Sequence, residues 1–316
     1  MKLNISRQET LFIKGIAILF VILSHMGLFD CGGVIGVHLF LIVSGYGICC
    51  SYENNGKTSY WKRRISSVYM PYLFSTLILL IVRLIIYKYN DFSWKKLLIT
   101  LAGLDFDLNI DPTMWYISYI FVCYFIAWGI FLIGSDKSKT WIALIFGIIC
   151  FFIITACGYK HIIWHQGTNV WAYGLSFPFG MFMAKARKEK GKLLSAIKNL
   201  LVIASGGGGV LFLLNKQHDS WIKFLFTLSS AILIMVICGW IFNCKEEMIK
   251  YIRPILYLGK NSYFMYLNEA FIIGCMPSRQ NNKILITVFV IIISYILSVL
   301  FDKIYKKIYI QGEKQL

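Results

Sequence analysis

Charged residues are scarce in this 316-residue chain, and acidic residues are the scarcer kind. Asp, Glu, Lys and Arg together make up 15% of the sequence, against 58% for hydrophobic residues. This balance excludes an ordinary soluble domain, in which about 25% of residues are charged. No hydrophilic stretch exceeds about 30 residues, which leaves no room for an appended soluble domain of ordinary size. We therefore expect a single membrane-embedded domain, residues 1–316.

Cysteine pairs with metal-binding spacing are also missing. The nine cysteines include no C-x-x-C pair, and most lie in apolar runs, where Cys behaves as a small hydrophobic residue. His161 and His165 have a helical i, i+4 spacing, but two ligands are too few for a metal site. The glycine run 206–209 has no neighbouring Lys-Ser/Thr, so close helix packing or a flexible break is favoured over phosphate binding. The sequence predicts neither a disulfide framework nor a metal site.

Long apolar runs are what the chain has in abundance, with a mean hydropathy of +0.67. A membrane-crossing helix needs roughly 20 mostly apolar residues. The qualifying runs predict an all-α polytopic membrane protein, a bundle of about ten transmembrane helices. They lie near residues 10–28, 33–50, 68–87, 113–133, 141–157, 170–184, 199–214, 221–243, 254–275 and 284–301.

Basic residues are distributed unevenly between the loops. With the N-terminus in the cytoplasm, 21 of the 32 Lys and Arg fall in cytoplasmic segments and 7 in outer ones. This bias follows the positive-inside rule, so we expect both termini in the cytoplasm. The net charge of +17 is then topological and does not indicate nucleic-acid binding. Residues 94–104, WKKLLITLAGL, are too short to span and predict an interfacial helix.

Lys14 and His25 lie in the first apolar run, where burying a titratable side chain costs free energy. Their separation of 11 residues corresponds to a rise of about 16 Å and about three turns of α-helix, so they share one face. One interpretation places Lys14 at the inner headgroups and His25 at the outer helix end. The other is a polar track with a cation near the cytoplasm and a general base deeper in the membrane, since the pKa of an unperturbed His is near neutrality.

Four stretches resemble the acyltransferase-3 family of integral membrane O-acyltransferases. Its first helix carries Arg, ten residues, then His, where this chain has Lys14 and His25; Lys keeps the charge but lacks the guanidinium fork. Glu269 and Ser67 stand near positions where many members have His and a second Arg. The stretches are GVHLFLIVSGYGI (36–48), WKRRISSVYMPY (61–72), TMWYISYIFVCYF (113–125) and SYFMYLNEAF (262–271).

The resemblance implies an acyltransferase of the bacterial cytoplasmic membrane. Such an enzyme transfers an acyl group, usually acetyl from acetyl-CoA, to a hydroxyl of an exopolysaccharide, O-antigen, capsule or other envelope glycan, or of its lipid-linked precursor. The donor is a cytoplasmic substrate, and no bound cofactor or metal is expected. A transporter of a glycan or small solute remains the alternative, because about ten spans are also typical of exporters.

The resemblance implies roles for the inner and central residues. His25 is the expected catalytic base, and Lys14 the expected contact to a donor phosphate. The cluster Lys62, Arg63 and Arg64 suits donor phosphates, or else is a plain positive-inside loop.

Polar residues within later spans are further candidates. Glu269 is a second catalytic candidate, because a carboxyl inside a span is costly unless paired or functional; a pairing with Lys260 or Arg83 would instead be structural. His38, Ser44 and Tyr46 are candidates for lining the cavity or supporting an oxyanion.

An acidic and aromatic stretch lies in the outer segment before the fourth span. Carboxylates and aromatic faces suit the hydroxyls and C–H surfaces of a sugar, although exposed loops are acidic for ordinary reasons. We expect acceptor binding here by Asp105, Asp107, Asp111, Trp115 and Tyr116.

The predicted topology can be tested by cysteine labelling. A single cysteine at position 109, in the segment 88–112, should react with an impermeant reagent added outside the cell, because this segment is predicted to face outward. A cysteine at position 138 should react only after permeabilisation. Labelling of position 109 from the cytoplasmic side alone would contradict the topology.

Overall fold

The structure is a computed structural model, and it describes residues 5–87, 93–104, 115–133, 149, 173–187, 220–242, 247–276 and 282–315. These residues form helices, and no strand occurs among them. The helices are α1 (Arg7–His25), α2 (Gly32–Asn55), α3 (Tyr60–Arg64), a π-helical turn η1 (Ile65–Tyr69), α4 (Met70–Tyr87), α5 (Trp94–Leu101), α6 (Trp115–Ile133), α8 (Ser176–Ala186), α10 (Ser220–Ile241), α11 (Glu247–Cys275) and α12 (Lys283–Gln315).

The all-helical prediction is confirmed for the part of the chain that is described. Six stretches are long and apolar enough to cross a membrane, and they match six of the predicted runs. They are Arg7–His25, Gly32–Asn55, Tyr60–Val82, Trp115–Ile133, Lys223–Ile241 and Lys283–Tyr309. The predicted spans 141–157 and 199–214 lie outside the described residues, so the number ten stays a prediction.

Two predicted spans differ from the helices observed. The run 254–275 belongs to the longer α11, which begins at Glu247 and carries both Pro254 and charged residues. The run 170–184 corresponds to α8, which has only 11 residues and begins at Ser176. Pro178 lies in the first turn of α8, where its missing N–H costs no helical hydrogen bond. The apolar run therefore begins before the helix does.

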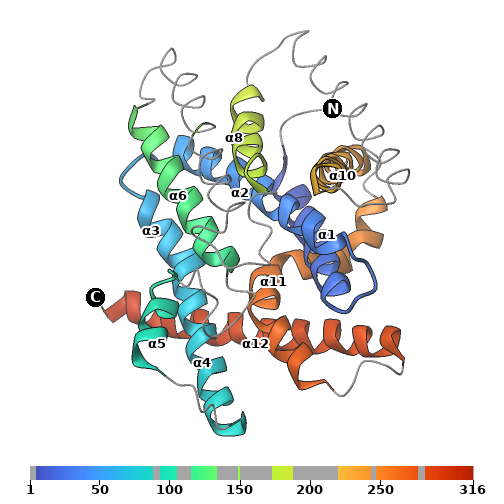
Figure 1. The fold of residues 1–316 in the computed structure, drawn as a ribbon. Coiled ribbons are helices and arrows are strands. Elements are labelled where there is room, and N and C mark those ends of the chain that lie inside the picture. The colour runs from blue at the N-terminus through green and yellow to red at the C-terminus, as the bar shows by residue number, and fades with distance from the viewer. Residues whose placement is uncertain are drawn as a thin grey trace.

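The bundle is built around α1 and α2, which pack against each other (Figure 1). Helix α11 packs along α1, while α8 and α10 pack on α2. Helix α12 lies at one side of the bundle and contacts α11 and α4. The buried apolar core accordingly runs through α1 and α2, whereas α12 turns many large apolar side chains outward, as a lipid-facing helix does.

The short helix α5 is anchored to η1 and α4. The Tyr72 hydroxyl donates to the Thr100 carbonyl, and the Tyr69 hydroxyl donates to the Leu101 carbonyl at 3.0 Å. Trp94 and Leu98 remain exposed on its other face. This exposed apolar face suits the predicted interfacial position.

Glycine allows the closest helix contacts. A Cβ on Gly15 would collide with the Ile255 carbonyl, and a Cβ on Gly259 would collide with the Leu11 carbonyl, so α1 and α11 touch backbone to backbone. Helices α2 and α8 have the same reciprocal arrangement, in which Gly45 faces the Phe177 carbonyl and Gly180 faces the Ile42 carbonyl. Small residues are the usual means of close approach between membrane helices.

A glycine substitution tests this packing. Gly259→Ala should destabilise the protein by about 1–3 kcal/mol, because the added methyl group meets rigid backbone. The measurement is the thermal unfolding midpoint of the detergent-solubilised protein. Gly129→Ala is the matched control, since a Cβ there meets nothing within 4 Å. Equal midpoints for the two variants would contradict the packing argument.

Candidate functional site

His25 is the last residue of α1, and its position is fixed by the way the helix ends. Gly27 follows with φ of 67°, a conformation that glycine adopts without strain. The Leu28 N–H donates to the Leu23 carbonyl and the Gly27 N–H donates to the Ser24 carbonyl, both at 2.9 Å. This is the Schellman pattern of a helix C-terminus. It ends α1 directly after His25 and leaves the imidazole at the mouth of the bundle.

The carboxylate of Glu269 contacts this imidazole. His25 Nδ1 and Glu269 Oε1 lie 2.7 Å apart, joining α1 to α11 across 244 residues of sequence. The His25 side chain is 39% exposed, whereas that of Glu269 is fully buried. Lys260, one of the two basic residues that were candidates for a structural pairing with Glu269, is exposed. The buried carboxyl is thus paired with the imidazole at the C-terminal end of α1.

The pair has the composition of an acid–base device. A carboxylate at Nδ1 favours the tautomer that carries its proton on Nδ1, which makes Nε2 the basic nitrogen. The same carboxylate stabilises the imidazolium that forms when Nε2 takes a proton. Helix α11 positions Glu269 for this task because the Gly15–Gly259 contact holds α1 and α11 together ten residues earlier on both helices.

An inner cavity of about 260 Å³ adjoins α1 on the face that carries Lys14 and His25. Lys14 and Arg64 supply two cations to its lining. Ser44 and Tyr116, two of the predicted site residues, also line it. Arg64 is held by Ser51, whose hydroxyl lies 3.3 Å from Nη2, and its guanidinium lies 5.6 Å from the centre of the Tyr124 ring. The cavity therefore combines positive charge with an aromatic wall.

Helix geometry aligns this cavity with the His25–Glu269 pair. Ser262 and Tyr266 of α11 line the cavity, and Glu269 follows on the same face, about one turn beyond Tyr266. His25 similarly shares a face with Lys14, about 16 Å further along α1. The Tyr116 and Tyr266 rings meet edge to face with centroids 5.3 Å apart. Both rings line the cavity, and Tyr266 is the cavity residue of α11 that lies nearest to Glu269 in the sequence.

A π-helical turn, which was not predicted from the sequence, forms part of the cavity wall. In η1, Ser67 and Val68 line the cavity next to Arg64. The Tyr263 hydroxyl donates to the Val68 carbonyl at 2.8 Å, and the Tyr305 hydroxyl donates to the Ser66 carbonyl at 2.7 Å. Single π-turns inside helices are frequent at functional sites. Tyr263, which also lines the cavity, was not singled out from the sequence.

The three clustered cations of α3 are separated by the fold. Arg64 lines the inner cavity, whereas Arg63 is exposed and donates to Asn55 Oδ1 at 2.5 Å. Lys62 is exposed and is not part of the lining of the inner cavity. Only one of the three therefore faces the candidate site directly.

The other predicted residues of α2 and α6 take different places. His38 is buried and bridges helices, with Nδ1 2.6 Å from Ser176 Oγ and Nε2 3.2 Å from Thr227 Oγ1. Tyr46 lines a second, open cavity, where its hydroxyl accepts from the Ile5 N–H at 3.0 Å. Trp115 stacks on Tyr173 with ring centroids 5.3 Å apart.

The acidic acceptor candidates Asp105, Asp107 and Asp111, and also His161, His165 and the run 206–209, lie outside the described residues. Within the described ranges, no group of three or more His, Cys, Asp or Glu residues could hold a metal ion.

Comparison with known proteins adds one finding. A family model described as an acyltransferase domain, of the acyltransferase-3 type, matches residues 12–303, nearly the whole chain. Neither the curated proteins nor the solved structures contain a match. The matched range includes Lys14, His25 and Glu269.

Proposed function

The chain belongs to the acyltransferase-3 family of membrane acyltransferases, and from this premise we propose its reaction. It moves an acyl group, which we take to be acetyl, from acyl-CoA to a hydroxyl of an envelope glycan or its lipid-linked precursor. The observation that carries the proposal is the His25–Glu269 contact at 2.7 Å, one turn beyond a cavity that contains Lys14 and Arg64. A base and a cationic donor pocket are the two parts such a transfer needs.

His25 serves as the general base in this scheme. The acceptor hydroxyl oxygen attacks the thioester carbonyl carbon while its proton passes to Nε2 of His25. The tetrahedral intermediate then collapses, the C–S bond breaks, and the CoA sulfur leaves with the proton that His25 returns. Glu269 keeps the imidazole oriented and compensates the imidazolium between these two steps. No metal is needed for either step.

The length of the donor fits the spacing of the charges. The pantetheine arm of CoA is equivalent to about five extended peptide units, or roughly 17 Å. Lys14 and His25 are separated by about 16 Å along α1. A pyrophosphate beside Lys14 and Arg64 therefore brings the thioester to the level of His25. The guanidinium of Arg64 offers the bidentate fork that Lys14 lacks.

The aromatic end of the cavity favours a short acyl chain. Tyr116 stands between Phe40 and Tyr266, with ring centroids 6.4 Å and 5.3 Å away, respectively. In the proposed scheme, an acyl chain that enters from the cavity passes Tyr266 before it reaches Glu269, which follows on the same face of α11, so a short chain is favoured. Acetyl fits this restriction best, which supports acetyl-CoA as the donor substrate.

Mass spectrometry of envelope glycans tests the reaction. Cells that carry the protein should show glycans heavier by one acetyl group, and cells with His25→Ala should not, although the variant inserts normally. The kcat of His25→Ala in membranes should fall by roughly 10²–10⁴, the usual contribution of a positioned general base. Glu269→Gln, which keeps the shape but removes the charge, should also lower kcat. Substantial transfer by well-folded His25→Ala protein would contradict the assignment.

Donor kinetics test the cationic pocket separately. Lys14→Ala and Arg64→Gln should raise the KM for acetyl-CoA with a smaller change in kcat, because they remove binding shared by ground and transition states. Lys14→Arg should keep activity, since it preserves the charge and adds a phosphate-matching fork. Arg63→Gln is the matched comparison from the same helix and should raise KM less. Equal effects of Arg63→Gln and Arg64→Gln would show that only the general charge of this face matters.

A further inference from the structure

A second cavity of about 660 Å³ opens beside the inner one and has no role in the scheme so far. Thr10 and Gly47 line both cavities, so the two adjoin at α1 and α2. Its wall includes Arg7 at the start of α1 and Arg187 directly after α8. No carboxylate contributes to the lining that the structure describes. The open cavity is therefore a positively charged vestibule to the inner one.

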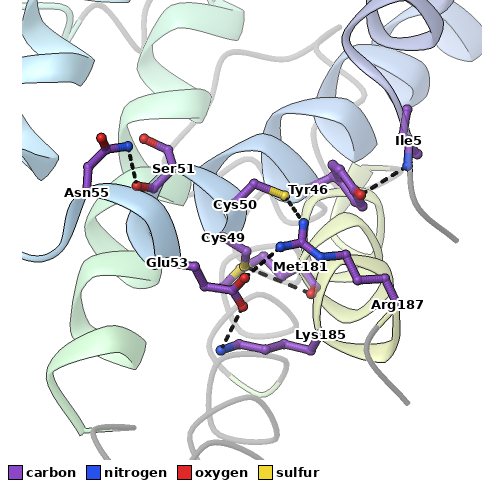
Figure 2. A network of polar contacts seen from close by, with 10 residues as sticks. All are labelled: Ile5, Tyr46, Cys49, Cys50, Ser51, Glu53, Asn55, Met181, Lys185 and Arg187. Carbon is purple, nitrogen blue, oxygen red and sulfur yellow. Dashed lines mark hydrogen bonds and ion pairs between the residues drawn. The ribbon is translucent and has the colours of Figure 1, made fainter. Parts of the chain in front are cut away.

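Arg187 is held in place by a network of contacts (Figure 2). Its Nη2 donates to Glu53 Oε2 at 2.7 Å, and its Nη1 contacts the sulfur of Cys50. Its guanidinium also lies 5.7 Å from the centre of the Tyr46 ring. These contacts fix the side chain at the cavity wall before any ligand arrives, which lowers the entropy lost on binding.

The network keeps a net positive charge. Glu53 is shared between Arg187 and Lys185, whose Nζ lies 3.6 Å from Oε1, so one carboxylate faces two cations. Arg7 adds a further positive charge to the lining of the same cavity, and it is exposed. Two guanidinium groups on one open cavity make a site suited to a phosphate dianion.

The position of Arg7 relates this site to the donor. Arg7 precedes Lys14 by seven residues and therefore lies about 10 Å further from His25 along α1. In CoA, the adenosine 3′-phosphate lies beyond the pyrophosphate when viewed from the thioester. A donor whose pyrophosphate reaches Lys14 and Arg64 thus extends its adenosine end towards Arg7 and Arg187. Along α1, the Lys14–Arg64 pair and then the Arg7–Arg187 pair thus follow the same order as the pyrophosphate and the 3′-phosphate of CoA.

We propose that Arg7 and Arg187 form a second anion site that binds the 3′-phosphate of the donor's adenosine. The proposal rests on the proposed function for the identity of the donor. It gives the open cavity a specific task, which is to select CoA thioesters over pantetheine thioesters and dephospho-CoA. The inner cavity binds the pyrophosphate and the pantetheine arm, which CoA and dephospho-CoA share.

The kinetic experiment compares acetyl-CoA with acetyl-dephospho-CoA, which lacks only the 3′-phosphate. The wild-type protein should prefer acetyl-CoA in kcat/KM by roughly tenfold or more, as expected for a charged hydrogen-bonded phosphate. Arg7→Gln and Arg187→Gln should each reduce this preference towards one. Lys14→Gln should weaken both donors alike and keep the preference. Lys57→Gln, which removes an exposed cation that lines neither cavity, should change neither donor.

A binding experiment makes the result independent of turnover. Purified wild-type protein should bind adenosine 3′,5′-bisphosphate more tightly than adenosine 5′-monophosphate, and Arg7→Gln should abolish the difference. Because Arg187 also holds the Glu53 network, Arg7→Gln decides the question if Arg187→Gln fails to fold. Transfer without any dependence on the 3′-phosphate would overturn the anion site but keep the reaction. Binding that depends on the 3′-phosphate without transfer would support the site and overturn the reaction.

An anionic lipid headgroup offers the same phosphate chemistry from another source. Reconstitution into vesicles with and without phosphatidylglycerol separates the two sources. The preference for acetyl-CoA should be the same in both vesicles and should still be lost in Arg7→Gln. If Arg7→Gln altered only the dependence on phosphatidylglycerol and left the donor preference intact, the cavity would be a lipid site and the proposal would be overturned.

Discussion

The backbone contact between α1 and α11 is the constraint on which the candidate site depends. Gly15 and Gly259 let the two helices touch without intervening side chains. His25 and Glu269 each follow their glycine by ten residues, so the two helices carry the pair forward by the same rise of about 15 Å. A larger residue at either glycine would separate the helices and with them the imidazole and the carboxylate. The geometry of the His25–Glu269 pair is therefore set by a backbone contact about 15 Å away along the two helices.

Single residues at the site could be predicted from the sequence because burying them is expensive. Lys14, His25 and Glu269 each interrupt an apolar run, and a titratable group at that depth needs a partner or a function. Their pairing could not be predicted, since 244 residues separate His25 from Glu269 and only tertiary packing brings them together. The catalytic roles themselves stay predictions that the proposed experiments address.

Local geometry decided what the sequence left open. Lys62, Arg63 and Arg64 are adjacent and equivalent in a charge count, but only Arg64, which directly precedes the π-turn, lies in the wall of the inner cavity. A π-turn leaves no clear mark in hydropathy, because one extra residue in a turn does not change the apolar pattern. The start of α8 was missed for a similar reason, since hydropathy reports apolarity and not the first helical hydrogen bond.

Among the described residues of the bundle, the acidic side chains Glu53 and Glu269 lie in direct contact with basic ones, whereas two cations share a cavity. Glu269 contacts His25, and Glu53 contacts both Arg187 and Lys185, while Lys14 lines a cavity of about 260 Å³ together with Arg64. Two like charges on one cavity repel each other when it is empty, and an anionic ligand relieves that repulsion on entry. Lys14 therefore need not reproduce every contact of an arginine, because Arg64 supplies the planar fork and Lys14 the second charge. For the proposed donor, the cavity as a whole, and not either cation alone, is the expected site of the pyrophosphate.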